Sequence, residues 1–186
     1  MAGRRTDTRE RIQQVALELF AERGYDKTTL QEVAERLEIT RPALYYHFRT
    51  KEAILASVVE RLVESMDELV AWAGEQPATT EARKEILARI SGLLEDQWRP
   101  LFQFAQVNQG VMRELPAGER MQRGLLEMIS VLASPGDDPV RGFEARLAVL
   151  AVVLGSVPFL FDMEVPDERR TAVALEVAGK LIAGGY

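Results

Sequence analysis

Residues 29–48 read TLQEVAERLEITRPALYYHF, and this stretch decides the fold. Thr29, with Glu32 three residues later, forms a capping box that predicts the start of a helix. A short break at Glu38-Ile39 separates this helix from a second one, which Thr40 caps. Two short helices joined by such a turn form a helix-turn-helix, the unit that lays its second helix in the major groove of DNA.

The residues around this stretch supply the rest of a small helical domain. Apolar residues recur at helical spacing from about Thr8 to Arg23, and Gly24 follows where a helix commonly ends. A longer amphipathic helix is predicted from Lys51 to about Trp72. We therefore expect three helices in a DNA-binding domain at residues 1–52.

The second helix of the motif keeps Leu44 and Phe48 for the interior and offers small, polar and aromatic side chains outward. Arg41 can donate two hydrogen bonds to the O6 and N7 atoms of guanine, and Gln31 is a second candidate for reading the bases. Hydroxyl, imidazole and helix-start groups suit phosphate oxygens. The predicted DNA-binding residues are Thr29, Gln31, Thr40, Arg41, Pro42, Ala43, Tyr45, Tyr46, His47 and Lys51.

The charge distribution agrees with this reading, although the net charge of −6 is unusual for a DNA-binding protein. Residues 1–51 hold 10 Lys/Arg and 8 Asp/Glu, a balance of +2, and residues 52–186 have a balance of −8. A protein that compacts DNA without regard to sequence, which is one alternative, needs a stronger positive charge. The difference between the two segments is small enough to arise by chance.

An enzyme or a ligand carrier with an incidental helix-turn-helix is the other alternative to a DNA-binding regulator. The composition argues against an enzyme. The chain has no cysteine and one histidine, and it lacks a phosphate-binding loop and any cluster with metal-ligand spacing, so we expect no catalytic site, no metal and no cofactor. The N-terminus lacks the apolar segment of a signal peptide. The longest uncharged stretch, residues 147–161, has 15 residues where a membrane helix needs about 20. We expect a cytoplasmic protein without membrane contact.

Nearly every remaining segment has the periodicity of a helix, and alternation typical of strands is absent. The predicted fold class is all-α, with a C-terminal helical domain for effector binding and dimerisation at residues 53–186. Its further helices are expected at about 80–96, 98–114, 117–133, 140–161 and 167–183.

Residues 24–52, GYDKTTLQEVAERLEITRPALYYHFRTKE, closely resemble the N-terminal domain of the TetR family of bacterial repressors, and the resemblance covers about residues 8–55 without a gap. Glu38 stands where that family usually has glycine. The resemblance implies a homodimer on a pseudo-palindromic double-stranded operator, joined through about 140–161 and 167–183. The nearly uniform apolar character of residues 140–161 supports this, although a core helix of a monomer is the alternative.

The resemblance also implies a repressor that a small-molecule effector releases from its operator by tilting the helix that begins at Lys51. A ligand-independent regulator, or an activator, with the same fold is the alternative. Aromatic, Met and amide side chains could line an effector pocket, or they could simply be core and surface residues. These candidates are Met66, Trp98, Phe102, Gln103, Gln106, Gln109, Met128 and Phe143.

Overall fold

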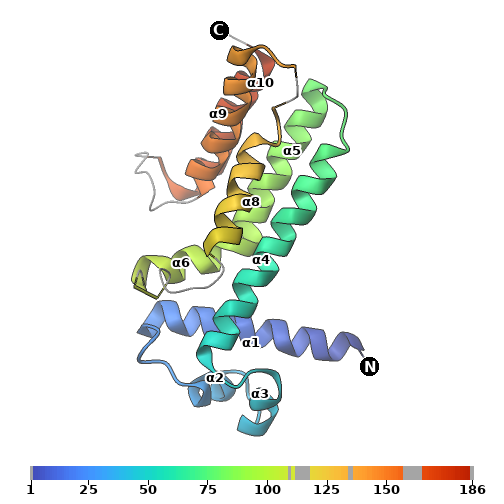
Figure 1. Cartoon of the computed structure of the whole chain (residues 1–186). Coiled ribbons are helices and arrows are strands. Elements are labelled where there is room, and N and C mark those ends of the chain that lie inside the picture. The colour runs from blue at the N-terminus through green and yellow to red at the C-terminus, as the bar shows by residue number, and fades with distance from the viewer. Residues whose placement is uncertain (1, 109, 112–117, 134–135, 157–164, 185–186) are drawn as a thin grey trace. The chain divides into compact units, whose positions relative to one another are not determined.

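The computed structural model describes residues 2–108, 110–111, 118–133, 136–156 and 165–184, and all regular structure in these residues is helical (Figure 1). The all-α fold class is therefore confirmed. The helices are α1 Ala2–Arg23, α2 Leu30–Arg36, α3 Arg41–His47, α4 Lys51–Gly74, α5 Thr80–Leu93, a π-helical turn Leu94–Trp98, α6 Arg99–Val107, α8 Gly118–Ser130, α9 Pro139–Ser156 and α10 Asp167–Ala183.

The chain divides into two compact units. The N-terminal unit comprises Met1–Leu62 and Pro100–Gly118, and the body unit comprises Val63–Arg99 and Glu119–Tyr186. The division falls within α4, which continues from one unit into the other. The predicted domain boundary at residue 52 stays a prediction.

The expected break between helices 80–96 and 98–114 is wrong. The chain passes from α5 through the π-helical turn into α6 without leaving helical structure. Pro100 would clash with the carbonyl four residues earlier in a regular helix, and the wider π turn directly before it relieves this conflict. α6 also ends earlier than predicted, at Val107.

The other predicted boundaries agree with the structure to within a few residues at most ends. α10 has the predicted bounds, and α9 covers the predicted segment up to Ser156, with residues 157–161 outside the described part. α1 is longer than predicted, since it begins at Ala2.

The core of the N-terminal unit joins α6 to the motif. Phe20, Tyr25 and Phe104 form an aromatic cluster with ring centroids 4.9 to 6.0 Å apart, and all three side chains are buried. Beside it, Asn108 Oδ1 accepts a hydrogen bond from the Tyr25 amide at 2.9 Å, and its Nδ2 donates to the Phe20 carbonyl at 3.2 Å. The end of α6 thereby fixes the turn between α1 and α2.

In the body unit α10 packs along α9 and also against α5. The close approach of the two helices depends on Gly155, because a Cβ at this position would overlap the Cβ of Ala174. Thr171 of α10 donates a hydrogen bond to Glu95 in the π-helical turn, and Ser65 of α4 bonds Gln97 in the same turn. α4 and α10 are thus each hydrogen-bonded to the π-helical turn.

Candidate nucleic-acid interface

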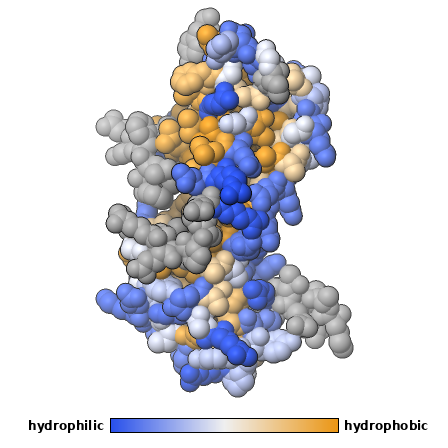
Figure 2. Space-filling model, viewed as in Figure 1, coloured by the Kyte–Doolittle hydropathy of each residue, from blue (hydrophilic) through white to orange (hydrophobic). Residues whose placement is uncertain are grey.

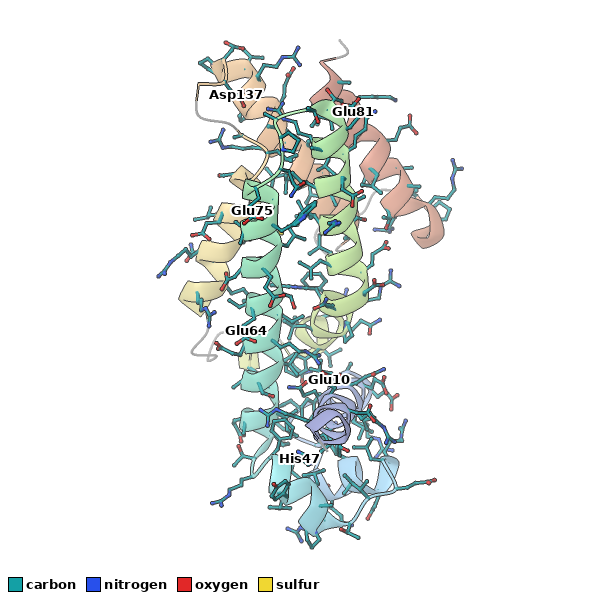
Figure 3. The ribbon with its side chains drawn as sticks, turned by 90° about the vertical axis from the view of Figure 1, so that its right-hand side faces the viewer. Glu10, His47, Glu64, Glu75, Glu81 and Asp137 are labelled. Carbon is teal, nitrogen blue, oxygen red and sulfur yellow. The ribbon has the colours of Figure 1, made fainter. Side chains whose placement is uncertain are left out.

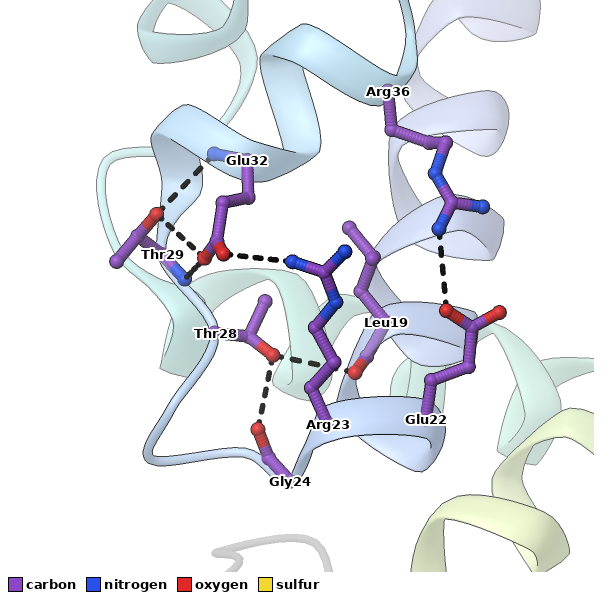
Figure 4. Close-up of polar contacts among 8 residues, drawn as sticks. All are labelled: Leu19, Glu22, Arg23, Gly24, Thr28, Thr29, Glu32 and Arg36. Atoms are coloured by element: carbon purple, nitrogen blue, oxygen red, sulfur yellow. Dashed lines mark hydrogen bonds and ion pairs between the residues drawn. The ribbon is translucent and has the colours of Figure 1, made fainter.

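The start of α2 is held by the predicted capping box (Figure 4). The Glu32 amide donates to Thr29 Oγ1 at 3.2 Å, and the Thr29 amide donates to the Glu32 carboxylate at 2.8 Å. The bond from the Thr29 amide to the carboxylate, followed by a bond from the Thr29 hydroxyl to the same carboxylate, is the main reason why the pKa of Glu32 is lowered. Arg23 of α1 pairs with Glu32 at 2.9 Å, so the cap also links α2 to the preceding helix.

The turn between α2 and α3 is a Schellman motif with an acidic residue at its left-handed position. The Ile39 amide donates to the Ala34 carbonyl at 3.0 Å, and the Glu38 amide donates to Glu35 at 3.1 Å. Glu38 has a φ of 55°, a region that favours glycine. At this departure from the family pattern, glutamate thus adopts the left-handed conformation that glycine favours.

α3 turns one face inward and leaves the other exposed. Leu44 and Phe48 are buried, and Thr40 caps the helix by accepting a hydrogen bond from the Ala43 amide at 3.4 Å. Pro42 and Ala43 lie exposed in the first turn. Small side chains here allow the helix backbone to approach the floor of a groove closely.

The polar face of α3 carries four further candidates. Arg41 donates to the Tyr45 hydroxyl at 3.0 Å, and its guanidinium lies 5.0 Å from the centre of that ring. Tyr46 is 67% exposed and meets the half-buried His47 edge to face. Figure 3 labels His47 at the end of α3 and Glu10 on α1. These side chains thus lie on one helix, which the buried side chains of Leu44 and Phe48 hold in the core.

The side chains of Lys51 and Gln31 both donate hydrogen bonds to other residues of the chain. Lys51 Nζ donates to the Tyr25 carbonyl at 2.6 Å and lies 4.5 Å from the centre of the Tyr25 ring, while the Tyr25 hydroxyl donates to Glu52 at 3.0 Å. Burial and the Glu52 carboxylate raise the pKa of Tyr25. Gln31 donates to Glu35 at 2.7 Å. Lys51 holds the α1–α2 turn, and its contact with phosphate stays a prediction.

Arg9 belongs beside these residues, although its local sequence did not point to it. Its guanidinium lies 4.3 Å from the centre of the Phe48 ring and donates to the His47 carbonyl at 3.5 Å. An arginine at the C-terminal end of α3 also interacts favourably with the helix dipole. The contact arises from the packing of α1 against the end of α3, so no periodic pattern could reveal it.

The effector candidates are divided between the two units of the chain. Met66, Trp98 and Met128 are buried in the body unit, where a Cβ at Gly124 would overlap the end of Met66. Gln103 and Gln106 are exposed and Phe102 is half-buried on α6, in the N-terminal unit. Phe143 is 63% exposed on α9, and Gln109 lies outside the described residues. The assignment of these side chains to an effector stays a prediction.

The arrangement defines a class of protein: a helix-turn-helix domain with an exposed second helix, followed by a helical body. Residues 12–58 match the model of the bacterial regulatory proteins, tetR family. The match lies in the N-terminal domain, and there it confirms the resemblance to the TetR family that the sequence predicts. None of the described helices combines the length and apolar composition that crossing a bilayer requires.

Curated relatives match part of the chain. The chain is 33% identical over 94 residues to the uncharacterized HTH-type transcriptional regulator YerO of Bacillus subtilis, covering 50% of this chain and 32% of YerO. It is 34% identical over 62 residues to IcaR of Staphylococcus aureus, the HTH-type negative transcriptional regulator of the biofilm operon icaADBC, covering 33% of each chain. The matches thus span about a third of each relative's length, and both relatives are named as regulators rather than enzymes.

Solved structures share the fold over nearly the whole chain. The TetR family transcriptional regulator PfmR of Thermus thermophilus aligns with a TM-score of 0.66 at 19% identity, covering 94% of this chain and 98% of PfmR. The transcriptional regulator FadR of Bacillus subtilis, solved in complex with stearoyl-CoA, aligns with a TM-score of 0.59 at 18% identity, covering 95% and 99%. At this identity the likeness establishes the fold.

Proposed function

We propose that the chain is a sequence-specific DNA-binding transcriptional regulator that inserts α3 into the major groove. The proposal rests on the two faces of α3. Leu44 and Phe48 are buried on the inner face, and Arg41, Pro42 and Ala43 are exposed. Among the residues that the structure describes, Arg41 makes no ion pair, so its positive charge is not neutralised by a carboxylate. A protein of this kind acts where the chromosome is, in the cytoplasm.

The regulator acts as a homodimer on a pseudo-palindromic operator. α9 and α10 expose large apolar side chains: Val140 and Phe143 are each 63% exposed, Leu154 38% and Val177 40%. Figure 2 shows apolar residues gathered over α9. Covering such a surface with a second copy removes it from water, and two-fold symmetry then presents two α3 helices to two half-sites.

The dimer proposal is tested by the sedimentation of full-length variants. Val177→Glu places a charge within the apolar surface and is expected to shift the protein toward the monomer. Lys180→Gln, one turn further along α10, is the matched control and is expected to remain a dimer. Unchanged sedimentation of Val177→Glu would contradict the placement of the interface.

We further propose repression that a small-molecule effector relieves. IcaR is named as a negative regulator, and FadR was solved with stearoyl-CoA, so regulators with this fold include both properties. An effector can release DNA only if it has different affinities for the two conformations of the dimer. A ligand-independent regulator, or an activator, with the same interface is the second candidate.

Binding to genomic fragments tests the DNA interface. The full chain is mixed with sheared genomic DNA of the source organism, the bound fragments are sequenced, and their affinities are measured at fixed salt. Arg41→Ala is expected to lose binding to the selected fragment more than to random DNA. Arg36→Ala, which removes a positive charge that pairs with Glu22, is the control and is expected to weaken both alike. Equal losses for both variants would contradict the role of Arg41.

A further inference from the structure

We propose that Tyr45 is a positioning residue for sequence recognition, since it holds the Arg41 guanidinium in place for one guanine in each half-site. The inference rests on the proposed function and assigns Tyr45 a role different from that of a phosphate donor. Its support comes from the contact between the two side chains, from their difference in exposure and from the charge state of the arginine.

Two interactions join the side chains, which lie one helical turn apart on α3. Arg41 Nη2 donates to the Tyr45 hydroxyl at 3.0 Å, and the guanidinium carbon lies 5.0 Å from the ring centre. A hydrogen bond and a cation–π contact together restrict more of the arginine's torsions than either does alone. The long side chain therefore loses part of its rotamer freedom before DNA arrives, which lowers the entropic cost of binding.

The Tyr45 side chain is more restricted than the Arg41 side chain that it contacts. Tyr45 is half-buried, whereas Arg41 is exposed. A tyrosine anchored by its neighbours has two torsions to fix, and an unsupported arginine has four. The contrast with Tyr46 is direct, because Tyr46 is 67% exposed and contacts His47. The two adjacent tyrosines are thus suited to different tasks.

The partner of Arg41 leaves its charge intact. Two other arginines of the same unit, Arg23 and Arg36, pair with carboxylates at 2.9 and 3.2 Å. A phenol instead accepts one hydrogen bond from Arg41 and remains neutral. Most of the five N–H donors of the guanidinium stay available, including the pair that can meet the O6 and N7 atoms of guanine.

The test measures base preference in four full-length proteins: wild type, Arg41→Ala, Tyr45→Phe and the double variant. Each is titrated against the operator selected by the wild type and against every single-base-pair change of one half-site, at fixed salt. Arg41→Ala is expected to reduce discrimination about 5- to 150-fold at one G·C pair, which corresponds to about 1–3 kcal/mol. Tyr45→Phe is expected to reduce it about 2- to 10-fold at the same pair, the effect of one hydrogen bond.

The double variant isolates the coupling. Once Arg41 is alanine, Tyr45→Phe should cause no further loss at that base pair. Tyr46→Phe is the matched control, since it removes a hydroxyl from the same helix, and we expect it to change the affinity for all duplexes by one factor. The inference is overturned if Tyr45→Phe does the same, leaves discrimination unchanged, or affects a base pair that Arg41→Ala does not.

A measurement on the free protein separates failure of this inference from failure of the proposed function. ¹⁵N relaxation at Nε of Arg41 is compared with that of Arg49, an exposed arginine of the same unit. We expect Arg41 to be the more ordered of the two in the wild type and to lose that order in Tyr45→Ala. Equal mobility of Arg41 in both proteins overturns the positioning role even if DNA binding is intact. If Arg41 is ordered but no duplex is preferred, the proposed function fails instead.

Discussion

Replacing Glu38 by glycine should stabilise the protein, because the left-handed turn between α2 and α3 now contains a residue with a side chain. Its φ of 55° closes a Schellman motif whose two hydrogen bonds, to Ala34 and Glu35, are both in place. Glycine adopts this conformation without steric cost, and the motif's hydrogen bonds do not involve the side chain. Glu38→Gly therefore removes strain and leaves the turn otherwise unchanged.

Two opposing effects set the magnitude. An L-residue in the left-handed region costs about 1–2 kcal/mol, which the substitution recovers. Glycine also gives the unfolded chain more freedom, which lowers stability by about 0.4–1 kcal/mol. The net gain in the free energy of unfolding is about 0.5–1 kcal/mol. For a chain of 186 residues this corresponds to a rise of about 1–4 °C in Tm.

Chemical denaturation of the full chain is the assay, and Glu38→Ala is the matched control. Alanine removes the same charge but keeps a Cβ, so the strain remains and no comparable gain is expected. Any change in DNA affinity caused by loss of the negative charge should appear in both variants. Equal stability of the alanine and glycine variants would show that the side chain, rather than the backbone conformation, determines the effect.

Three other substitutions test separate parts of the structure. Asn108→Ala leaves the Tyr25 amide without its partner and should destabilise the protein by about 1–3 kcal/mol, with faster hydrogen exchange at that amide; unchanged exchange would contradict the role of the amide side chain. Gly155→Ala forces α9 away from α10 and should lower the free energy of unfolding by about 1–3 kcal/mol. Gly92→Ala on α5 is the control: a Cβ there meets nothing within 4 Å, so the free energy of unfolding should rise by about 0.5–1 kcal/mol. Equal effects of the two variants would contradict the close approach of α9 and α10. The lowered pKa of Glu32 contributes stability that is present above its ordinary pKa and is lost as the pH falls through the lowered folded value, and Thr29→Ala should move that pKa upward in an NMR titration. Because the variant keeps the Thr29 backbone amide, a Glu32 pKa that Thr29→Ala leaves in place would show that the Thr29 hydroxyl does not lower it.

The DNA-binding motif could be predicted from the sequence because its determinants are local. Thr29 and Thr40 cap the helices from within three residues, and both caps are present in the structure. The left-handed turn at Glu38 was also predictable, because a family resemblance gave the residue type expected there. α10 was predicted with its observed bounds because Pro166 precedes its first residue and Gly184 follows its last.

Features that depend on packing between distant segments could not be predicted. The amide of Asn108 is bonded to Phe20 and Tyr25, more than 80 residues away in the chain, and no local pattern indicates those partners. Arg9 reaches the end of α3 for a similar reason. The break expected near Pro100 failed because a π-helical turn accommodates the proline, and single-residue propensities do not encode that adjustment.

The most direct test of the central claim is selection of bound duplexes from a random pool by the full-length protein at physiological salt, followed by sequencing. We expect an enriched inverted repeat with half-site centres one helical turn apart or a multiple of that distance, and a conserved G·C pair in each half that Arg41→Ala no longer selects. Well-folded, effector-free protein that enriches no sequence would contradict the assignment of this chain as a sequence-specific regulator.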